Sequence, residues 1–345
     1  MKPHNFVMPM RRRSFFPSFR QFRKAVMSEP NIKSLSGETS GPYPHCEGCF
    51  YDYGNQLGHM GPGGCLQEPS EFSSSEEFEG SFTADETRQE NDTNDTQTIQ
   101  IVSDVHLEHR AYGDYFTIKP VAKNLALLGD IGKPFHASYR DFLALQSSAF
   151  QKVFVIIGNH EKYGSNADAV DDKVRQVCST FPNVHLLERD SFQLTERTTL
   201  LGCTLWSNID NRSSLSINDF NLIKTNEDKG MLSRDTYLSW HRRDVKWIEN
   251  AIQTVASEGR KAVVFTHHGP HPAMSGKYLG SPISSAFVTD LSRLLKPPVI
   301  AWASGHVHSN VDFVEAGVRL VSNAVGYPRE NGQVGFNNDV VLEFD

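Results

Sequence analysis

Short apolar runs alternate with amphipathic stretches from residue 98 to the end of the chain. Apolar runs bounded by polar or turn residues predict buried strands, and apolar positions spaced three and four apart predict helices. The predicted strands are 98–104, 124–130, 152–159, 185–188, 198–206, 261–267, 299–306, 311–315, 318–323 and 339–344. The predicted helices are 141–147, 168–180, 236–257 and 284–295. This alternation indicates an α/β fold for a domain spanning 98–345.

The preceding residues lack this pattern. Residues 1–42 are predicted to be a disordered basic tail, because the first 33 residues carry eight Lys or Arg and one acid. An organellar transit peptide has a similar composition, although Pro9 and Pro17 would interrupt its amphipathic helix. Residues 67–97 are rich in Ser, Thr, Glu and Asp, and such a segment buries too little apolar surface to fold. They are predicted to form an acidic flexible linker.

Between these segments lies an island of Cys and His residues, 43–66. Its side chains follow a C-x2-C-x9-H-x5-C pattern made of Cys46, Cys49, His59 and Cys65. Three thiolates and one imidazole can complete a tetrahedral structural zinc site. The spacing is equally compatible with a short motif that binds a protein partner, or with a plain loop.

Charge and apolar content limit the classes of partner. From residue 98 onward there are 25 basic and 27 acidic residues, so no broad positive field attracts nucleic acid. No run approaches the roughly 20 apolar residues needed to span a membrane, and the start lacks a secretory signal. Five Cys are too few for a disulfide framework. We therefore expect an intracellular protein, cytoplasmic unless the basic tail directs it to an organelle.

Five polar motifs follow predicted strands directly. Because ligands bind beyond the carboxyl ends of the strands in α/β sheets, side chains at several such ends can converge on one site. The motifs are Asp104-Val105-His106, Gly129-Asp130, Gly158-Asn159-His160, His267-His268 and Gly305-His306-Val307-His308. Each motif alone occurs by chance, but the whole ordered set predicts one shared site.

The side chains of these motifs offer oxygen and nitrogen donors. Asp, Asn and His together suit Mn²⁺, Fe or Zn²⁺, and one carboxylate can bridge two cations through its two oxygens. Two cations about 3.5–4 Å apart bind a phosphate, lower the pKa of a bound water and neutralise charge during in-line attack. The set therefore predicts a binuclear phosphoesterase that acts on a small phosphomonoester or phosphodiester.

The same segments resemble the calcineurin-like metallophosphoesterase superfamily, and in particular a branch of small single-domain enzymes. The resemblance is carried by residues 103–108, 128–132, 157–161, 266–269 and 304–308. It implies a four-layer α/β/β/α sandwich of two mixed sheets, with the metal centre at the sheet edges.

The resemblance also implies a role for each side chain. One cation would be held by Asp104, His106 and His308. The other would be held by Asn159, His267 and His306. Asp130 and a hydroxide would bridge the pair, and His160 would be free to act as the general acid. Of the adjacent histidines, His267 is the expected ligand, since only one of two neighbouring side chains can point at the metals.

Two other classes of function remain open at this stage. A non-catalytic scaffold could keep the metals and present a binding surface, and a nuclease could use the same centre. The loop after Asp130 continues with Gly132, Lys133 and Pro134, which departs from the common pattern of the superfamily. Substrate-binding residues and the oligomeric state are therefore not assigned from the sequence.

Overall fold

The computed structural model describes residues 96–111, 116–330 and 333–344. The basic tail, the Cys/His island with Cys46, Cys49, His59 and Cys65, and all but the last residues of the acidic linker lie outside this range. The predictions made for them stay predictions. Within the described residues, no helix is both long enough and apolar enough to cross a membrane.

The first sheet is mixed and has five strands. In spatial order these are β13 (Val341–Phe344), β1 (Gln97–Val102), β2 (Asn124–Leu128), β3 (Lys152–Ile156) and β4 (Val184–Leu186). Strands β1 to β4 run parallel, and β13 pairs antiparallel with β1. The four parallel strands therefore end at the same edge of the sheet.

The second sheet is also mixed and has six strands. Their order is β11 (Val311–Glu315), β12 (Val318–Ser322), β10 (Val299–Ser304), β9 (Lys261–Thr266), β6 (Thr198–Cys203) and β5 (Asp190–Gln193). The four central strands are parallel, while β11 and β5 are antiparallel to their neighbours.

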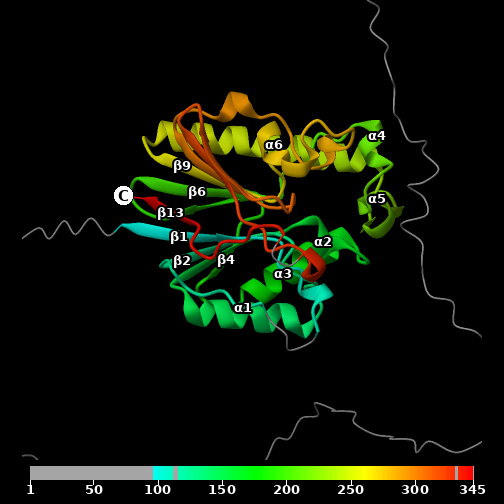
Figure 1. Ribbon diagram of the computed structural model, residues 1–345, viewed down its shortest axis with the longest axis horizontal. Coiled ribbons are helices and arrows are strands. Elements are labelled where there is room, and N and C mark those ends of the chain that lie inside the picture. Colours follow the sequence, from blue (N-terminus) through cyan, green and yellow to red (C-terminus); the bar gives the residue numbers. More distant parts are fainter. Residues whose placement is uncertain (1–95, 112–115, 331–332, 345) are drawn as a thin grey trace, which may run out of the picture. The chain divides into compact units, whose positions relative to one another are not determined.

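Helices cover the outer faces of the two stacked sheets (Figure 1). Helices α1 (Ala137–Ala149) and α3 (Ala167–Cys178) lie against the first sheet, and the long helix α6 (Arg234–Ser257) lies against the second. The inner faces meet through buried side chains such as Ile101, Phe154 and Val263. Because most strands are buried on both faces, their sequences read as continuous apolar runs. The predicted four-layer sandwich is confirmed.

Short helices, turns and strands connect these layers, and they lie within the loops. They are η1 (Leu107–His109), α2 (Asn159–Lys162), α4 (Asn211–Ser214), α5 (Asp219–Leu222), β7 (Lys224–Thr225), β8 (Gly230–Met231), η2 (Pro272–Tyr278), η3 (Ser284–Ala286), η4 (Ser292–Leu294) and η5 (Pro328–Glu330). The pattern of apolar positions in the sequence did not predict them, since each is too short to show a period.

The predicted helix 284–295 is wrong. The segment forms only the turns η3 and η4, with a bridge between Gly269 and Val288 in the intervening stretch. There the backbone N–H groups of Thr289 and Leu291 donate to the carbonyls of Gly269 and Pro270. These hydrogen bonds to another segment occupy the backbone N–H groups that a helix would have used. Val288 and Leu291 are nevertheless buried.

Candidate metal centre

The five polar motifs meet at one place in the structure. Each follows the carboxyl end of one of the parallel strands β1, β2, β3, β9 and β10. Backbone hydrogen bonds join the motifs directly: the N–H of His106 donates to the carbonyl of Asp130 at 2.9 Å, and that of Gly305 to His267 at 3.0 Å. The parallel arrangement of the strands therefore gathers the motif residues from both sheets.

The backbone at these strand ends has an uncommon conformation. Five motif residues that are not glycine have positive φ angles, namely Asp104 (54°), His106 (51°), Asp130 (54°), His306 (70°) and His308 (49°). A left-handed conformation costs roughly 1–2 kcal/mol for such a residue, and such residues concentrate at functional sites. The backbone at residue 158 also approaches Asp130 so closely that glycine is required there. A Cβ on Gly158 would lie 2.2 Å from an oxygen of Asp130.

One cluster of donors, here called the first half-site, consists of Asp104, His106 and His308. Its donor atoms lie within 4.8 Å of one another. The Nε2 atoms of the two histidines are 3.0 Å apart, and that of His308 is 3.4 Å from Asp104. Both Nδ1 atoms face carboxylates, Glu108 at 3.0 Å and Glu330 at 2.6 Å. Carboxylates at Nδ1 keep the proton there and leave each Nε2 as a metal ligand.

A second cluster, the second half-site, consists of Asn159, His267 and His306. The Nε2 atom of His267 lies 3.1 Å from Oδ1 of Asn159, and its Nδ1 donates to the carbonyl of Leu128 at 2.8 Å. The amide of Asn159 donates to Asp219 at 2.9 Å, which turns Oδ1 toward the histidine. The support behind this half-site is thus one backbone carbonyl and one carboxylate.

Asp130 lies between the two half-sites and is buried. Its Oδ1 is 3.4 Å from Nε2 of His267, and its Oδ2 is 3.9 Å from Nε2 of His106. Oδ1 also accepts the backbone N–H of His160 at 2.8 Å. One oxygen of the carboxylate thus faces each half-site, and the donor types fit divalent transition metals.

The charges of the site are balanced by its own histidines. Burial would raise the pKa of Asp130, but the imidazoles of His267 and His160 outweigh it and hold the pKa well below its usual value. Burial would also raise the pKa of Asp104, but the hydrogen bond and charge of His308 lower it below its usual value. Burial and the neighbouring histidines lower the pKa of His306. Both carboxylates are therefore ionised and ready to act as ligands.

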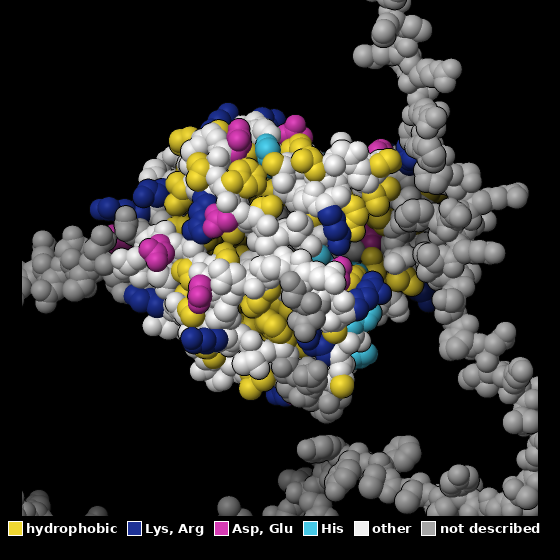
Figure 2. All heavy atoms as spheres, viewed as in Figure 1, with side chains coloured by type: hydrophobic (Ala, Val, Ile, Leu, Met, Phe, Trp, Pro, Cys, Tyr) yellow, Lys and Arg dark blue, Asp and Glu magenta, His cyan; other side chains and the backbone are white. Residues whose placement is uncertain are grey.

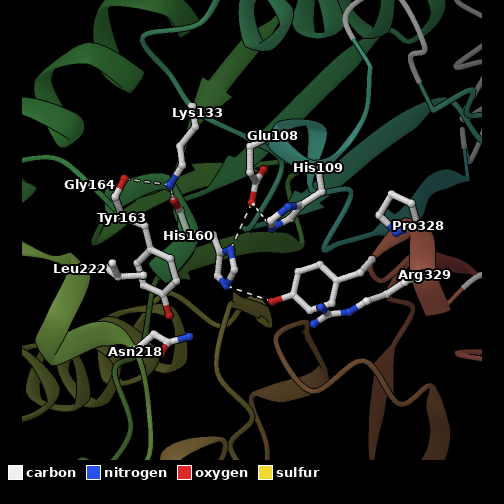
Figure 3. A pocket seen from close by; sticks show the side chains of 11 residues that line it. Glu108, His109, Lys133, His160, Tyr163, Gly164, Asn218, Leu222, Pro328 and Arg329 are labelled. Carbon is white, nitrogen blue, oxygen red and sulfur yellow. Dashed lines mark hydrogen bonds and ion pairs between the residues drawn. The ribbon is translucent and has the colours of Figure 1, made fainter. Parts of the chain in front are cut away.

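His160 projects beside the half-sites and has its own support (Figure 3). Its Nδ1 is 3.1 Å from Oε1 of Glu108, and its Nε2 is 3.2 Å from the hydroxyl of Tyr327. Burial lowers the pKa of His160, but the charges of Asp130 and Glu108 raise it above its ordinary value. Glu108 therefore orients both this imidazole and that of His106.

His268 differs from its neighbour. The side chain is buried, and neither ring nitrogen has a hydrogen-bond partner among the described residues. Its ring packs on those of His306, at 4.2 Å between centroids, and Trp206. Burial and the nearby charge of His267 lower the pKa of His268 to about 3, so the ring is a neutral part of the wall.

Two charged side chains fix the loops that carry the motifs. The buried carboxylate of Glu161 accepts the backbone N–H groups of Asp130, Ile131 and Gly158 at 2.7–2.9 Å. The ammonium of Lys133 donates to the backbone carbonyls of His160 and Tyr163. The loop that departs from the common pattern therefore has a structural contact of its own.

Several supporting residues were not predicted from the sequence. Glu108 follows His106 by two residues, so its proximity could have been noticed in the motif itself. Asp219, Tyr327 and Glu330 come from short irregular segments, and no periodic pattern connects them with the motifs. Their contacts depend on the path of the whole chain.

The calcineurin-like phosphoesterase family model matches residues 98–310. The chain belongs to the calcineurin-like phosphoesterases. It is 31% identical over 276 residues to the uncharacterized protein L509 of Acanthamoeba polyphaga mimivirus, covering 72% of this chain and 96% of that protein.

One solved structure shares the architecture of the catalytic domain. The phosphopantetheinyl hydrolase of Mycobacterium tuberculosis is similar with a TM-score of 0.52 at 20% identity, covering 68% of this chain and 91% of that one. A dimetal phosphatase from Danio rerio is more distant, with a TM-score of 0.42 and 13% identity over 67% and 88% of the two chains. As a calcineurin-like phosphoesterase with clustered Asp and His side chains, the protein is a metal-dependent hydrolase of phosphate esters.

Proposed function

We propose that this calcineurin-like phosphoesterase holds two divalent cations, one in each half-site, and hydrolyses a small phosphomonoester or phosphodiester. The observation that supports this most directly is the position of Asp130, whose two oxygens face His106 and His267 from opposite half-sites. A mononuclear site would need no shared carboxylate. The nitrogen and oxygen donors suit Mn²⁺, Fe or Zn²⁺.

When bound, the cations would supply an activated water and positive charge opposite the phosphate. The chain itself then has two tasks, to orient the phosphate and to protonate the leaving oxygen. The half-sites would orient the phosphate, so that water, having lost one proton to solvent, attacks phosphorus in line with the bond to the leaving oxygen. That P–O bond breaks as the O–P bond to water forms. The Nε2 atom of His160 gives its proton to the leaving oxygen.

The contacts of His160 suit this role. Glu108 holds Nδ1, so the opposite nitrogen, Nε2, is directed into the site toward the hydroxyl of Tyr327. A leaving oxygen in the position of that hydroxyl would lie within hydrogen-bonding distance of Nε2. Glu108 is a positioning residue here, because it acts through the imidazole.

The test compares metal-loaded and chelator-treated protein on aryl phosphomonoesters, aryl phosphodiesters, a cyclic nucleotide and single-stranded DNA. We expect metal-dependent turnover of an aryl ester, and at least ~100-fold lower kcat for His160→Ala, the usual scale for a general acid. The exposed His136→Ala is the matched control and should retain full activity.

Three results would contradict the proposal. Unchanged kcat in folded His160→Ala would remove the general acid. Absence of turnover with metal bound would favour the non-catalytic scaffold. Preferential cleavage of single-stranded DNA would instead favour the nuclease.

A further inference from the structure

Two hollows meet at His160. The inner chamber, about 290 Å³, lies over the metal ligands, and the outer chamber, about 590 Å³, opens on the other side of the imidazole. Five residues line both chambers: His160, Tyr163, Asn218, Tyr327 and Arg329. Figure 3 shows His160 and Tyr163 among the side chains that line the outer chamber. A substrate with its phosphate in the inner chamber could therefore extend past His160.

The direction of proton transfer indicates which part of the substrate extends outward. In the proposed reaction His160 protonates the leaving oxygen, so the leaving alcohol lies on the side of His160. The outer chamber borders that side and is large enough for a nucleoside-sized group, since small-molecule pockets have volumes of about 300–1,000 Å³. Tyr163, Leu222 and Pro328 give it an apolar wall.

The charged side chains of the outer chamber are mainly basic. Lys133 and Arg329 line it together with His109, whose pKa is lowered mainly by burial, and Glu108 is the one acid among its lining residues. Glu108 is already engaged by two imidazoles. In the space-filling view, Lys and Arg side chains lie next to His side chains at the end of the domain where the strands terminate (Figure 2).

Arg329 has the properties of an anion-binding residue. Its side chain is exposed, and its guanidinium lies 4.8 Å from the centroid of the Tyr327 ring. It makes no ion pair with any described residue, in contrast to Arg319, which pairs with Asp312. A guanidinium with free N–H groups can bind phosphate through two parallel hydrogen bonds.

We infer that the natural substrate is a phosphate ester whose leaving alcohol carries a second phosphate group, which Arg329 and Lys133 bind in the outer chamber. This inference rests on the proposed function, because that function defines the leaving-group side. It identifies the substrate class as bisphosphorylated compounds of about nucleotide size. Two N–H groups of Lys133 already donate to backbone carbonyls. This residue would therefore contribute mainly its positive charge to the binding of the second phosphate.

The test uses inhibition, so that it applies to either kind of ester. Adenosine 3′,5′-bisphosphate, adenosine 3′-monophosphate and adenosine 5′-monophosphate are compared as competitive inhibitors of aryl ester hydrolysis. We expect the bisphosphate to bind about tenfold more tightly than either monophosphate, the scale of one hydrogen-bonded charge pair. Arg329→Ala should reduce this ratio to near one, and Arg329→Lys should retain part of it.

Arg140→Ala is the matched control, because Arg140 is exposed on α1 away from both chambers and should leave the ratio unchanged. Equal inhibition constants in the natural protein, or an unchanged ratio in Arg329→Ala, would overturn the inference. If no aryl ester is hydrolysed, the proposed function fails. Titration of the three nucleotides into the Mn²⁺-loaded protein then decides the anion site separately, by the same ratio of Kd values.

Discussion

The two half-sites have similar donor side chains but differ in the groups that hydrogen-bond to those donors. In the first half-site, the histidines are held by the carboxylates of Glu108 and Glu330. In the second half-site, His267 is held by a backbone carbonyl, and the ring of His306 makes no hydrogen bond with any described residue. Two negative charges thus support the first half-site, and one, Asp219, supports the second.

This difference should determine how tightly each cation is held. A carboxylate hydrogen-bonded to Nδ1 makes the imidazole a better donor and adds negative charge near the metal. Asn159 contributes a neutral oxygen where the first half-site has the carboxylate of Asp104. We therefore expect the first half-site to bind its cation more strongly, with Asp130 shared by both.

The largest effect is expected from Asp130→Ala, which removes the shared ligand. Both cations should bind weakly, and kcat should fall by at least ~100-fold, since the two-metal arrangement is lost. Metal content after gel filtration and turnover of an aryl ester measure this. Glu315→Ala, an exposed change on β11, is the control. Retention of two cations and normal turnover would show that Asp130 bridges nothing.

The next effect is expected from Glu108→Gln. This carboxylate holds His106 and His160 together, and its pKa is lowered because those imidazoles outweigh the effect of burial. Replacing it should cost about 10- to 100-fold in kcat, the scale found for groups behind metal ligands. A larger loss in kcat than in metal affinity is expected, because His160 is also released. Parallel losses would mean that Glu108 supports the metal alone.

Stepwise removal of metal tests the comparison directly. As Mn²⁺ is withdrawn by a chelator, the electron paramagnetic resonance signal of a coupled pair should disappear first and leave that of a single ion. The Tm should fall in two stages, because each cation stabilises the folded state that binds it. Loss of both ions in one step would contradict the expected difference between the half-sites.

The convergence of the five motifs could be predicted from the sequence because each motif is local. A buried strand followed at once by Asp, Asn or His can be recognised from the sequence, and parallel strands bring such ends together whatever the loops do. The same reasoning could not identify Asp219, which reaches Asn159 across 60 residues from the short helix α5. Nor could it identify Glu330, which depends on the turn η5.

The error in residues 284–295 has the same origin. Apolar residues there have a spacing compatible with a helix, yet the backbone pairs with residues 269 and 270 instead. Such pairing depends on a neighbouring segment that local periodicity does not describe. Strand ends were therefore predictable, whereas the loops that support the ligands were not.

A smaller effect is expected from Asp219→Ala, which acts on the second half-site. The carboxylate accepts hydrogen bonds from Asn159 and from the hydroxyl of Tyr163. Without it, the amide of Asn159 keeps only its hydrogen bond to the hydroxyl of Tyr163, which itself loses its acceptor, and the Kd of the more weakly bound cation should rise about tenfold. Competition with a fluorescent chelator measures both Kd values. A change confined to the tighter cation would reverse the assignment of the half-sites.

The smallest effect is expected from Glu330→Gln in the first half-site. Its carboxylate faces Nδ1 of His308 at 2.6 Å, but its side chain is 22% exposed and also faces Lys277, so solvent and that ammonium weaken its influence. We expect the Kd of the tighter cation to rise by roughly three- to tenfold, at or below the low end for such groups. Glu315→Gln, on exposed β11, is the matched control. If Glu330→Gln instead raises the Kd of the other cation, hydrogen bonding by carboxylates does not explain the difference between the half-sites. Their order of affinity must then come from Asp104 and Asn159 alone.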